Sequence, residues 1–242
     1  FDHEKLREHF ALVESEGLVE GLRRIKEPAE VELLRASCGL NHRVMRDLPD
    51  QLAPGMTEAE TAWVIERMFR ELGAESLSFP TIVGVGKNAA LPHAIPGEAK
   101  VRDNELVLVD TGCRLHDYCS DQTRTFWVGR TPTERFDETR RLVLAAQKAG
   151  MEAIRPGAPI SGAYKAAHAV FEEAGVARMF THSLGHGIGL ETHEGPSLGP
   201  RAEGLFAPGM VVTVEPGLYD ADWGGIRWEY MVLVTEDGCK PF

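Results

Sequence analysis

The sequence predicts an α+β fold, a single domain in which helices cover a sheet. Helical and strand patterns follow one another in the order helix, helix, strands, and the same order recurs in the second half of the chain. The composition is that of a globular protein, with 43% hydrophobic and 26% charged residues. Two topologically similar halves are therefore expected, although the residues themselves show no strong repeat.

Two helices are predicted at the start of the chain. Residues 2–16 are expected to form the first, which Gly17 would end. Its apolar residues at helical spacing are Leu6, Phe10 and Val13. The second is predicted from Pro28 to about residue 48, because proline is favoured in a first helical turn and several glutamates lie near the positive end of the dipole.

A capped helix and three strands follow in the middle of the chain. Thr57 and Glu60 form a capping box, which predicts a helix through residue 72. Short apolar or alternating runs then predict strands over 79–85, 105–110 and 121–128.

The second half has the same order. Helices are predicted from residue 132 to about 154 and over 160–174, each stopped by a glycine or proline that follows it. Strands are predicted over 210–215 and 229–234.

Charge, hydropathy and cysteine content exclude several classes of protein. The net charge of −11 argues against nucleic acid as a partner, since that partner needs a basic face. No apolar run approaches the ~20 residues of a membrane span, and the first residues lack the apolar core of a signal peptide. The four cysteines form no CxxC pair and are expected to be reduced, mostly buried thiols. A cytoplasmic protein without a membrane partner is expected.

The stretch 182–194, with sequence HSLGHGIGLETHE, is the most distinctive part of the chain. It combines three histidines and two glutamates with three glycines. Histidine is the commonest metal ligand and a proton carrier near neutral pH, and glycine lets the backbone approach a bound group. The glycines oppose a helix, so a loop or irregular strand against a catalytic centre is expected. The alternative, a turn with incidental histidines, is disfavoured because three of the chain's nine histidines occur here.

Four acids lie at the ends of predicted strands. They are Asp110, Asp121, Glu215 and Glu229. A buried carboxylate without a partner is costly, so each needs a cation or hydrogen bonds. A single acid of this kind is commonly an exposed edge residue, but four of them together with the histidine stretch disfavour that interpretation.

Four carboxylates and one imidazole suit two hard divalent cations better than a single zinc ion. Mn²⁺ fits this ligand set, and Co²⁺ or Zn²⁺ are the alternatives. Two such ions ~3.5–4 Å apart can hold a bridging hydroxide and polarise a carbonyl together, which is the chemistry of hydrolysis.

Five motifs occur in one order along the chain. They are VDTG at 109–112, SDQTRTF at 120–126, HSLGHGIGLETHE at 182–194, VEPG at 214–217 and GIRWE at 225–229. Together they resemble the pita-bread metallopeptidases (family M24), which include aminopeptidase P, prolidase and methionine aminopeptidase. The resemblance implies the pita-bread fold, with two similar halves of helices and antiparallel strands around a central sheet. It implies a catalytic domain at 23–242, and residues 1–22 as an N-terminal helix or the remnant of a linker from a missing N-terminal domain.

The resemblance also implies a role for each matching residue. The implied metal ligands are Asp110, Asp121, His186, Glu215 and Glu229. Of these, Asp121 and Glu229 would bridge the ions or lie nearest both, and Glu215 would carry a proton between the bridging water and the leaving nitrogen. The histidines implied to steady the substrate carbonyl and the tetrahedral intermediate are His93, His182 and His193.

His182 and Arg227 place the resemblance in the proline-specific branch, because methionine aminopeptidases lack both. That branch cleaves the bond before proline in dipeptides or short peptides, a tertiary amide without an N–H. Arg227 is thus implied in catalysis, and neutralisation of Glu229 or Asp222 is its alternative role. Tyr230 departs from the family pattern, which often has an acid there, so a hydrogen bond to the metal ligands is expected to differ.

Three other functions remain open on the same fold. They are a methionine aminopeptidase-like enzyme, a metal-free creatinase-like hydrolase and a catalytically silent peptide-binding module. The last two have lost acids that this chain keeps. The sequence does not separate a dipeptidase from an aminopeptidase, and a homodimer is expected by resemblance only. Tryptophans that could line a pocket for the proline ring, or pack in the core or at the rim, are Trp127, Trp223 and Trp228.

Overall fold

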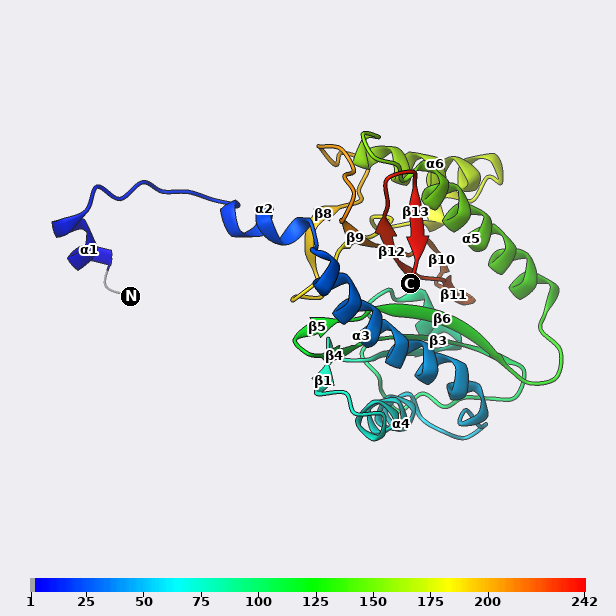
Figure 1. The fold of residues 1–242 in the computed structure, drawn as a ribbon. Coiled ribbons are helices and arrows are strands. Elements are labelled where there is room, and N and C mark those ends of the chain that lie inside the picture. The colour runs from blue at the N-terminus through cyan, green and yellow to red at the C-terminus, as the bar shows by residue number, and fades with distance from the viewer. Residues whose placement is uncertain (1–2) are drawn as a thin grey trace.

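The computed structural model describes residues 3–242, and its elements follow the predicted order of helices and strands twice over (Figure 1). The α-helices are α1 (His3–His9), α2 (Leu18–Arg24), α3 (Pro28–Asp47), α4 (Glu58–Glu71), α5 (Glu134–Ala153) and α6 (Ile160–Glu173). The 3-10 helices are η1 (Leu48–Asp50), η2 (Gly86–Ala90) and η3 (Ala177–Met179). The strands are β1 (Ser76–Leu77), β2 (Ile82–Val85), β3 (Glu105–Thr111), β4 (Cys113–Leu115), β5 (Tyr118–Cys119), β6 (Gln122–Val128), β7 (His186–Gly187), β8 (Glu194–Ser197), β9 (Val211–Val214), β10 (Gly217–Asp220), β11 (Gly224–Arg227), β12 (Tyr230–Val234) and β13 (Cys239–Pro241).

The first half is built around the antiparallel sheet β2-β3-β6, in which β3 is central. Successive side chains of a strand point to opposite faces. Val107 and Val109 therefore pack into the core formed with α3 and α4, whereas Leu106 and Leu108 face the core formed with α5 and α6. Asp110 continues the second row, so the end of β3 delivers a carboxylate to the side where the two halves meet.

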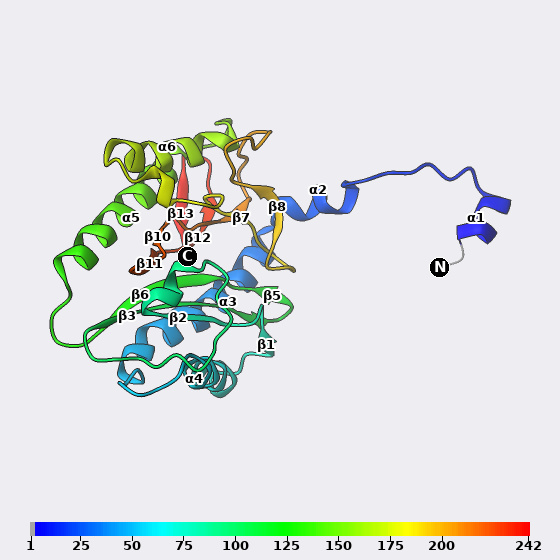
Figure 2. The same ribbon diagram turned by 180° about the vertical axis from the view of Figure 1, so that it is seen from behind.

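The second half contains the five-stranded sheet β13-β12-β9-β7-β8 and the hairpin β10-β11. Helices α5 and α6 pack together on this half, and their apolar residues share one core with β9 and β12 (Figures 1 and 2). Within residues 3–242 the strands form four sheets. The halves are joined where the backbone N–H of Glu229, before β12, donates to the carbonyl of Thr123 in β6 at 3.2 Å.

The prediction for residues 2–16 is only partly correct. Asp2, where that helix was expected to begin, lies outside the described residues, and α1 ends at His9. Residues 11–16 are not helical, and Val13 is 87% exposed. An isolated helix shorter than ~12–15 residues is marginal in water, and nothing covers the apolar side of this one among the described residues. Gly17 does not end a helix but precedes α2, in the left-handed conformation with φ 73°.

Two exclusions made from the sequence concern membranes and disulfides. Within residues 3–242, no helix combines the length and apolarity needed to cross a bilayer. All four cysteines are free thiols, and three of them are buried, as predicted.

Candidate active site

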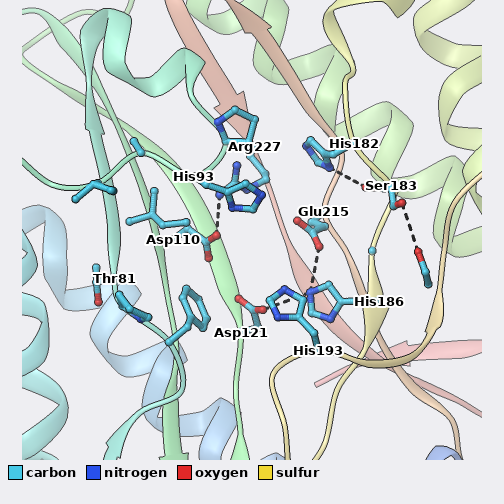
Figure 3. A pocket seen from close by; sticks show the side chains of 18 of the residues that line it. Thr81, His93, Asp110, Asp121, His182, Ser183, His186, His193, Glu215 and Arg227 are labelled. Carbon is cyan, nitrogen blue, oxygen red and sulfur yellow. Dashed lines mark hydrogen bonds and ion pairs between the residues drawn. The ribbon is translucent and has the colours of Figure 1, made fainter. Parts of the chain in front are cut away.

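A cavity of about 670 Å³ lies between the two halves, and its wall gathers residues from distant parts of the sequence (Figure 3). Eight of the nine residues singled out in the sequence line it. They are His93, Asp110, Asp121, His182, His186, His193, Glu215 and Arg227. The ninth, Glu229, is fully buried, and its carboxylate lies within 4.8 Å of ligand atoms from Asp121 and His186.

Strand ends explain how the acids come together. Asp110 is the second-last residue of β3 and lies opposite Thr123 of β6. Asp121 directly precedes β6. Glu215 follows β9, and Glu229 precedes β12, whose first residue pairs with the last residue of β9. Antiparallel pairing therefore places all four carboxylates at the junction of the halves.

His186 points an unprotonated nitrogen at these acids. Its Nδ1 donates to the carbonyl of Gly187 at 3.0 Å, because a carbonyl can only accept. Burial lowers the pKa of His186, so the ring is neutral and Nε2 carries a lone pair. That nitrogen lies 3.4 Å from Oε1 of Glu215 and 3.6 Å from Oδ2 of Asp121. A hydrogen-bonded Nδ1 with a free Nε2 is the usual arrangement of a metal-binding histidine.

The acids carry more negative charge than their surroundings balance. Burial, reinforced by neighbouring carboxylates, raises the pKa values of Asp121 and Glu229 well above the ordinary range. Burial likewise raises the pKa of Glu215 to about 8. Buried carboxylate oxygens without a hydrogen-bond partner within residues 3–242 include Oδ1 of Asp110, Oδ1 of Asp121 and Oε1 of Glu229. Oxygens of this kind at one place fit divalent cations, which would compensate both the charge and the missing partners.

Arg227 forms an ion pair with a different acid from the two that the sequence suggested. Its Nη2 donates to Oδ2 of Asp110 at 2.7 Å, so the ion pair is with that acid and not with Glu229 or Asp222. Its Nε donates to Thr123 at 3.0 Å and its Nη1 to the Tyr219 hydroxyl at 2.8 Å. The side chain is 3% exposed, so these contacts fix the guanidinium in the floor of the cavity.

His182 ends a chain of hydrogen bonds that begins at Arg227. Because Tyr219 accepts from Arg227, its own hydroxyl is free to donate to Nε2 of His182, 2.8 Å away. Nδ1 of His182 donates to the carbonyl of Ser183 at 2.7 Å. Burial lowers the pKa of His182 to about 4, which keeps the ring neutral and its tautomer fixed.

The loop that carries His193 is held by the segment before α3. Glu194 accepts from Nη2 of Arg23 at 2.5 Å and from Nζ of Lys26 at 3.0 Å. Its carboxylate also accepts from the N–H of Glu191, so it closes its own loop. The Lys26 side chain is 2% exposed, which makes this a buried ion pair at the edge of the cavity.

Three residues of the site were not found from the sequence. Thr123 donates to Oε2 of Glu229 at 2.8 Å, and Thr213 donates to Oε1 of Glu215 at 3.1 Å. Tyr219 is the third, through its contacts with Arg227 and His182. A usable signal existed for the threonines, because Thr123 follows Asp121 by two positions and Thr213 precedes Glu215 by two, and such positions share a strand face.

The tryptophans do not line the cavity. Trp127 packs against Phe136, with ring centroids 5.3 Å apart. Trp223 lies under Arg135, and Trp228 under Arg124 and Arg140. Packing in the core and at the rim is therefore their role. The apolar part of the cavity wall is made by other residues, which are Phe79, Pro80, Ile82, Pro92, Ala94, Ile95 and Pro96.

The residues of this site fall within a match to a known protein family. The sequence model of a protein family, described as metallopeptidase family M24, matches residues 32–236. The chain belongs to this family.

Relatives within M24 are similar in both sequence and structure. A protein named Xaa-Pro dipeptidase from Pyrococcus furiosus is 37% identical over 223 residues, 92% of this chain and 64% of that protein. The structure of the Xaa-Pro dipeptidase from Bacillus anthracis has a TM-score of 0.93 at 35% identity and covers 100% of this chain and 69% of that one. The structure of the X-Pro aminopeptidase from Thermotoga maritima has a TM-score of 0.90 at 34% identity, covering 92% of this chain and 63% of that one. The fold is thus the pita-bread fold, and the chain spans about 64% of the first curated M24 relative it matches.

Proposed function

We propose that this chain is the catalytic part of a metal-dependent exopeptidase that hydrolyses the Xaa-Pro bond at the amino end of dipeptides or short peptides. The observation that carries the proposal is the group of buried acids with unpaired oxygens around the Nε2 of His186. The names of the M24 relatives, Xaa-Pro dipeptidase and X-Pro aminopeptidase, support the substrate class.

Five residues would hold two divalent ions in this proposal. They are Asp110, Asp121, His186, Glu215 and Glu229. Mn²⁺ suits a set dominated by carboxylates, and Co²⁺ or Zn²⁺ are alternatives. When bound, the ions would polarise the scissile carbonyl and lower the pKa of water, so that a hydroxide nucleophile is available near neutral pH.

The other polar groups of the cavity would act on the substrate and on protons. Within residues 3–242, no hydrogen bond or ion pair holds the rings of His93 and His193, so their N–H groups are available to a substrate carbonyl. Both ring nitrogens of His182 are already hydrogen-bonded, to Ser183 and Tyr219, so His182 would steady the same region by holding Tyr219 in place. Glu215 would also carry a proton towards the leaving nitrogen, because its carboxylate lines the cavity beside the ring of His186.

The apolar wall supports proline as the residue after the scissile bond. A pyrrolidine ring is compact and apolar, and its nitrogen has no hydrogen to donate once in a peptide bond. The side chains of Phe79, Ile82 and Ile95 offer that ring an apolar surface beside the acids. We also keep the homodimer and the cytoplasmic location as predictions.

The test is hydrolysis of an Xaa-Pro dipeptide and an Xaa-Pro-Xaa tripeptide with Mn²⁺, before and after chelation. The rate of hydrolysis is expected to fall on chelation and to be restored by added Mn²⁺. Preference for the dipeptide would assign a dipeptidase, and preference for the tripeptide an aminopeptidase. Equal rates with and without chelator would end the proposal, and cleavage of Met-Ala-Ser but not Ala-Pro-Ala would favour a methionine aminopeptidase.

A further inference from the structure

One wall of the cavity is a short segment that follows η2 and carries His93. Pro92, His93, Ala94, Ile95 and Pro96 all line the cavity, yet Ile95 is 90% exposed. Because no hydrogen bond or ion pair within residues 3–242 holds the His93 ring, the backbone of this segment must place it. What fixes the two ends of the segment therefore decides where His93 lies.

Both ends of the segment are fixed by one carboxylate, that of Glu58. Its Oε1 accepts from the N–H of Val85 at 2.8 Å and from Nδ2 of Asn88 at 2.9 Å. Its Oε2 accepts from the N–H of Gly97 at 3.0 Å. Residues 88–97 thus form a loop closed at both ends on a single side chain of α4.

Glu58 is not required as a helix cap. The N-terminus of α4 already has a complete capping box, in which Thr57 accepts from the N–H of Glu60 and Glu60 accepts from that of Thr57. Glu58 is only 2% exposed, and within residues 3–242 no basic side chain forms an ion pair with it. A buried carboxylate is costly, and here the three N–H donors of the loop and strand offset that cost. Burial of this carboxylate is therefore explained if its role is to fix the position of the loop at the cavity.

We propose that Glu58 is a positioning residue for the proposed peptidase, holding His93 and the apolar wall at the cavity through the backbone of residues 88–97. The inference rests on the proposed function for its kinetic consequence, but its structural part stands on the loop itself. Substrate binding and turnover would both depend on Glu58, although this carboxylate does not line the cavity.

The test uses Glu58→Gln, which keeps the volume but replaces one carboxylate oxygen by an NH₂ group that cannot accept. One end of the loop is then released. We expect kcat/KM for an Xaa-Pro peptide to fall about 10- to 100-fold, since small misplacements of positioning groups have effects of this size. Metal content is expected to stay unchanged. Glu60→Gln is the matched control, because it changes the same charge on the same helical turn but touches only Thr57.

A double variant separates positioning from general destabilisation. If Glu58 acts through His93, then Glu58→Gln should cost much less in a His93→Ala background than in the wild type. Losses that simply multiply would overturn the proposal. Asn88→Ala, which removes one of the three donors, should give the same pattern with a smaller loss and provides a second variant should Glu58→Gln not fold.

Hydrogen–deuterium exchange provides a readout that does not depend on activity. Glu58→Gln should speed exchange across residues 88–97 while β3 and α6 keep their protection, and Glu60→Gln should leave residues 88–97 unchanged. Unchanged exchange in Glu58→Gln would overturn the inference even if the peptide assay succeeds. An inactive wild type with faster exchange in Glu58→Gln would instead overturn the proposed function and leave the loop anchor supported.

Discussion

The acids of the cavity are supported by residues at matching positions on neighbouring strands. Thr123, on β6, donates to Glu229 and accepts from Arg227, and Arg227 in turn binds Asp110. One hydroxyl therefore connects the two halves of the site. Groups of this kind orient metal ligands, and their loss usually weakens metal binding although they touch no metal.

Replacing Thr123 by valine tests this connection. The change keeps the shape of the side chain but removes the hydroxyl, so Glu229 loses its donor and Arg227 loses an acceptor. We expect the affinity for Mn²⁺ to fall about 10- to 100-fold, measured by calorimetric titration. Thr123→Ser keeps the hydroxyl and should bind nearly as the wild type does. An equal loss in both variants would show that packing, and not the hydrogen bond, matters here.

At the residue scale, the sequence predicted the acids and histidines because their types are rare in buried strands and their spacing is distinctive. Thr123 and Thr213 were not predicted, because threonine is common in strands and only the three-dimensional pairing shows what its hydroxyl contacts. Arg227 was singled out from the sequence and lines the cavity, but its partner Asp110 is 117 positions away in sequence. No local pattern can supply a contact of that range.

At the element scale, the histidine stretch works because its backbone lies directly against β9. The N–H of Glu215 donates to the carbonyl of Leu184 at 2.8 Å, and the N–H of His186 donates to the hydroxyl of Thr213 at 3.0 Å. A Cβ on Gly185 would come within 2.0 Å of the carbonyl oxygen of Thr213. Only glycine permits this approach, which sets the position of His186 relative to the acids.

Gly185→Ala should therefore disrupt both folding and metal binding. Forcing a methyl group against backbone is expected to lower the free energy of unfolding by about 1–3 kcal/mol, measured by urea denaturation. Metal affinity should fall with it, because Thr213 and His186 must move apart. Gly162→Ala is the control: nothing lies within 4 Å of its Cβ position in α6, and alanine should stabilise the helix by about 0.5–1 kcal/mol. Equal stability of the two variants would contradict this account.

Helices and strands with strong periodicity were predicted well, and isolated or very short ones were not. The structure has α3, α4, α5 and α6 close to their predicted ranges, since capping residues and apolar stripes define them. It also has short strands that carry no pattern of their own: β7 forms only by pairing with β8 and β9, and β10 forms only as a hairpin with β11. The helix predicted over residues 11–16 does not form, because the apolar side chains of this segment have no surface to pack against.

At the scale of the whole molecule, the site exists because two halves of similar design present their strand ends to each other. Each half brings helices to the outside of its sheet, and the acids of the site meet at the junction (Figures 1 and 3). The repeated element order indicated the two halves. How they are oriented was not accessible from composition or periodicity, and came only with the family resemblance.

The buried acids predict an unusual dependence of stability on pH for the metal-free protein. Burial raises the pKa values of Asp121, Glu215 and Glu229 in the folded state, that of Glu215 to about 8. Between the unfolded pKa values, near 4, and these raised values, the folded state binds more protons than the unfolded state, so stability falls as pH rises. The Tm of chelated protein should thus decrease between about pH 6.5 and pH 8, above the range in which the neutral rings of His182 and His186 have the opposite effect.

Adding Mn²⁺ should raise the Tm, and the rise should be larger at higher pH. Protons compete with metal ions for the same carboxylates, so binding strengthens as the acids lose their protons. Differential scanning fluorimetry with and without chelator measures both effects. A gap between the two melting curves that narrows as pH rises would contradict the placement of metal at these acids.

The number of metal ions bound per chain tests the central claim most directly. Protein dialysed against excess Mn²⁺, and then freed of unbound ions, should contain two ions per chain by mass spectrometry of the metal. Glu229→Gln should reduce that number, and Glu236→Gln, on an exposed residue outside the cavity, should not. Wild-type protein that holds no divalent ion under these conditions would contradict the account.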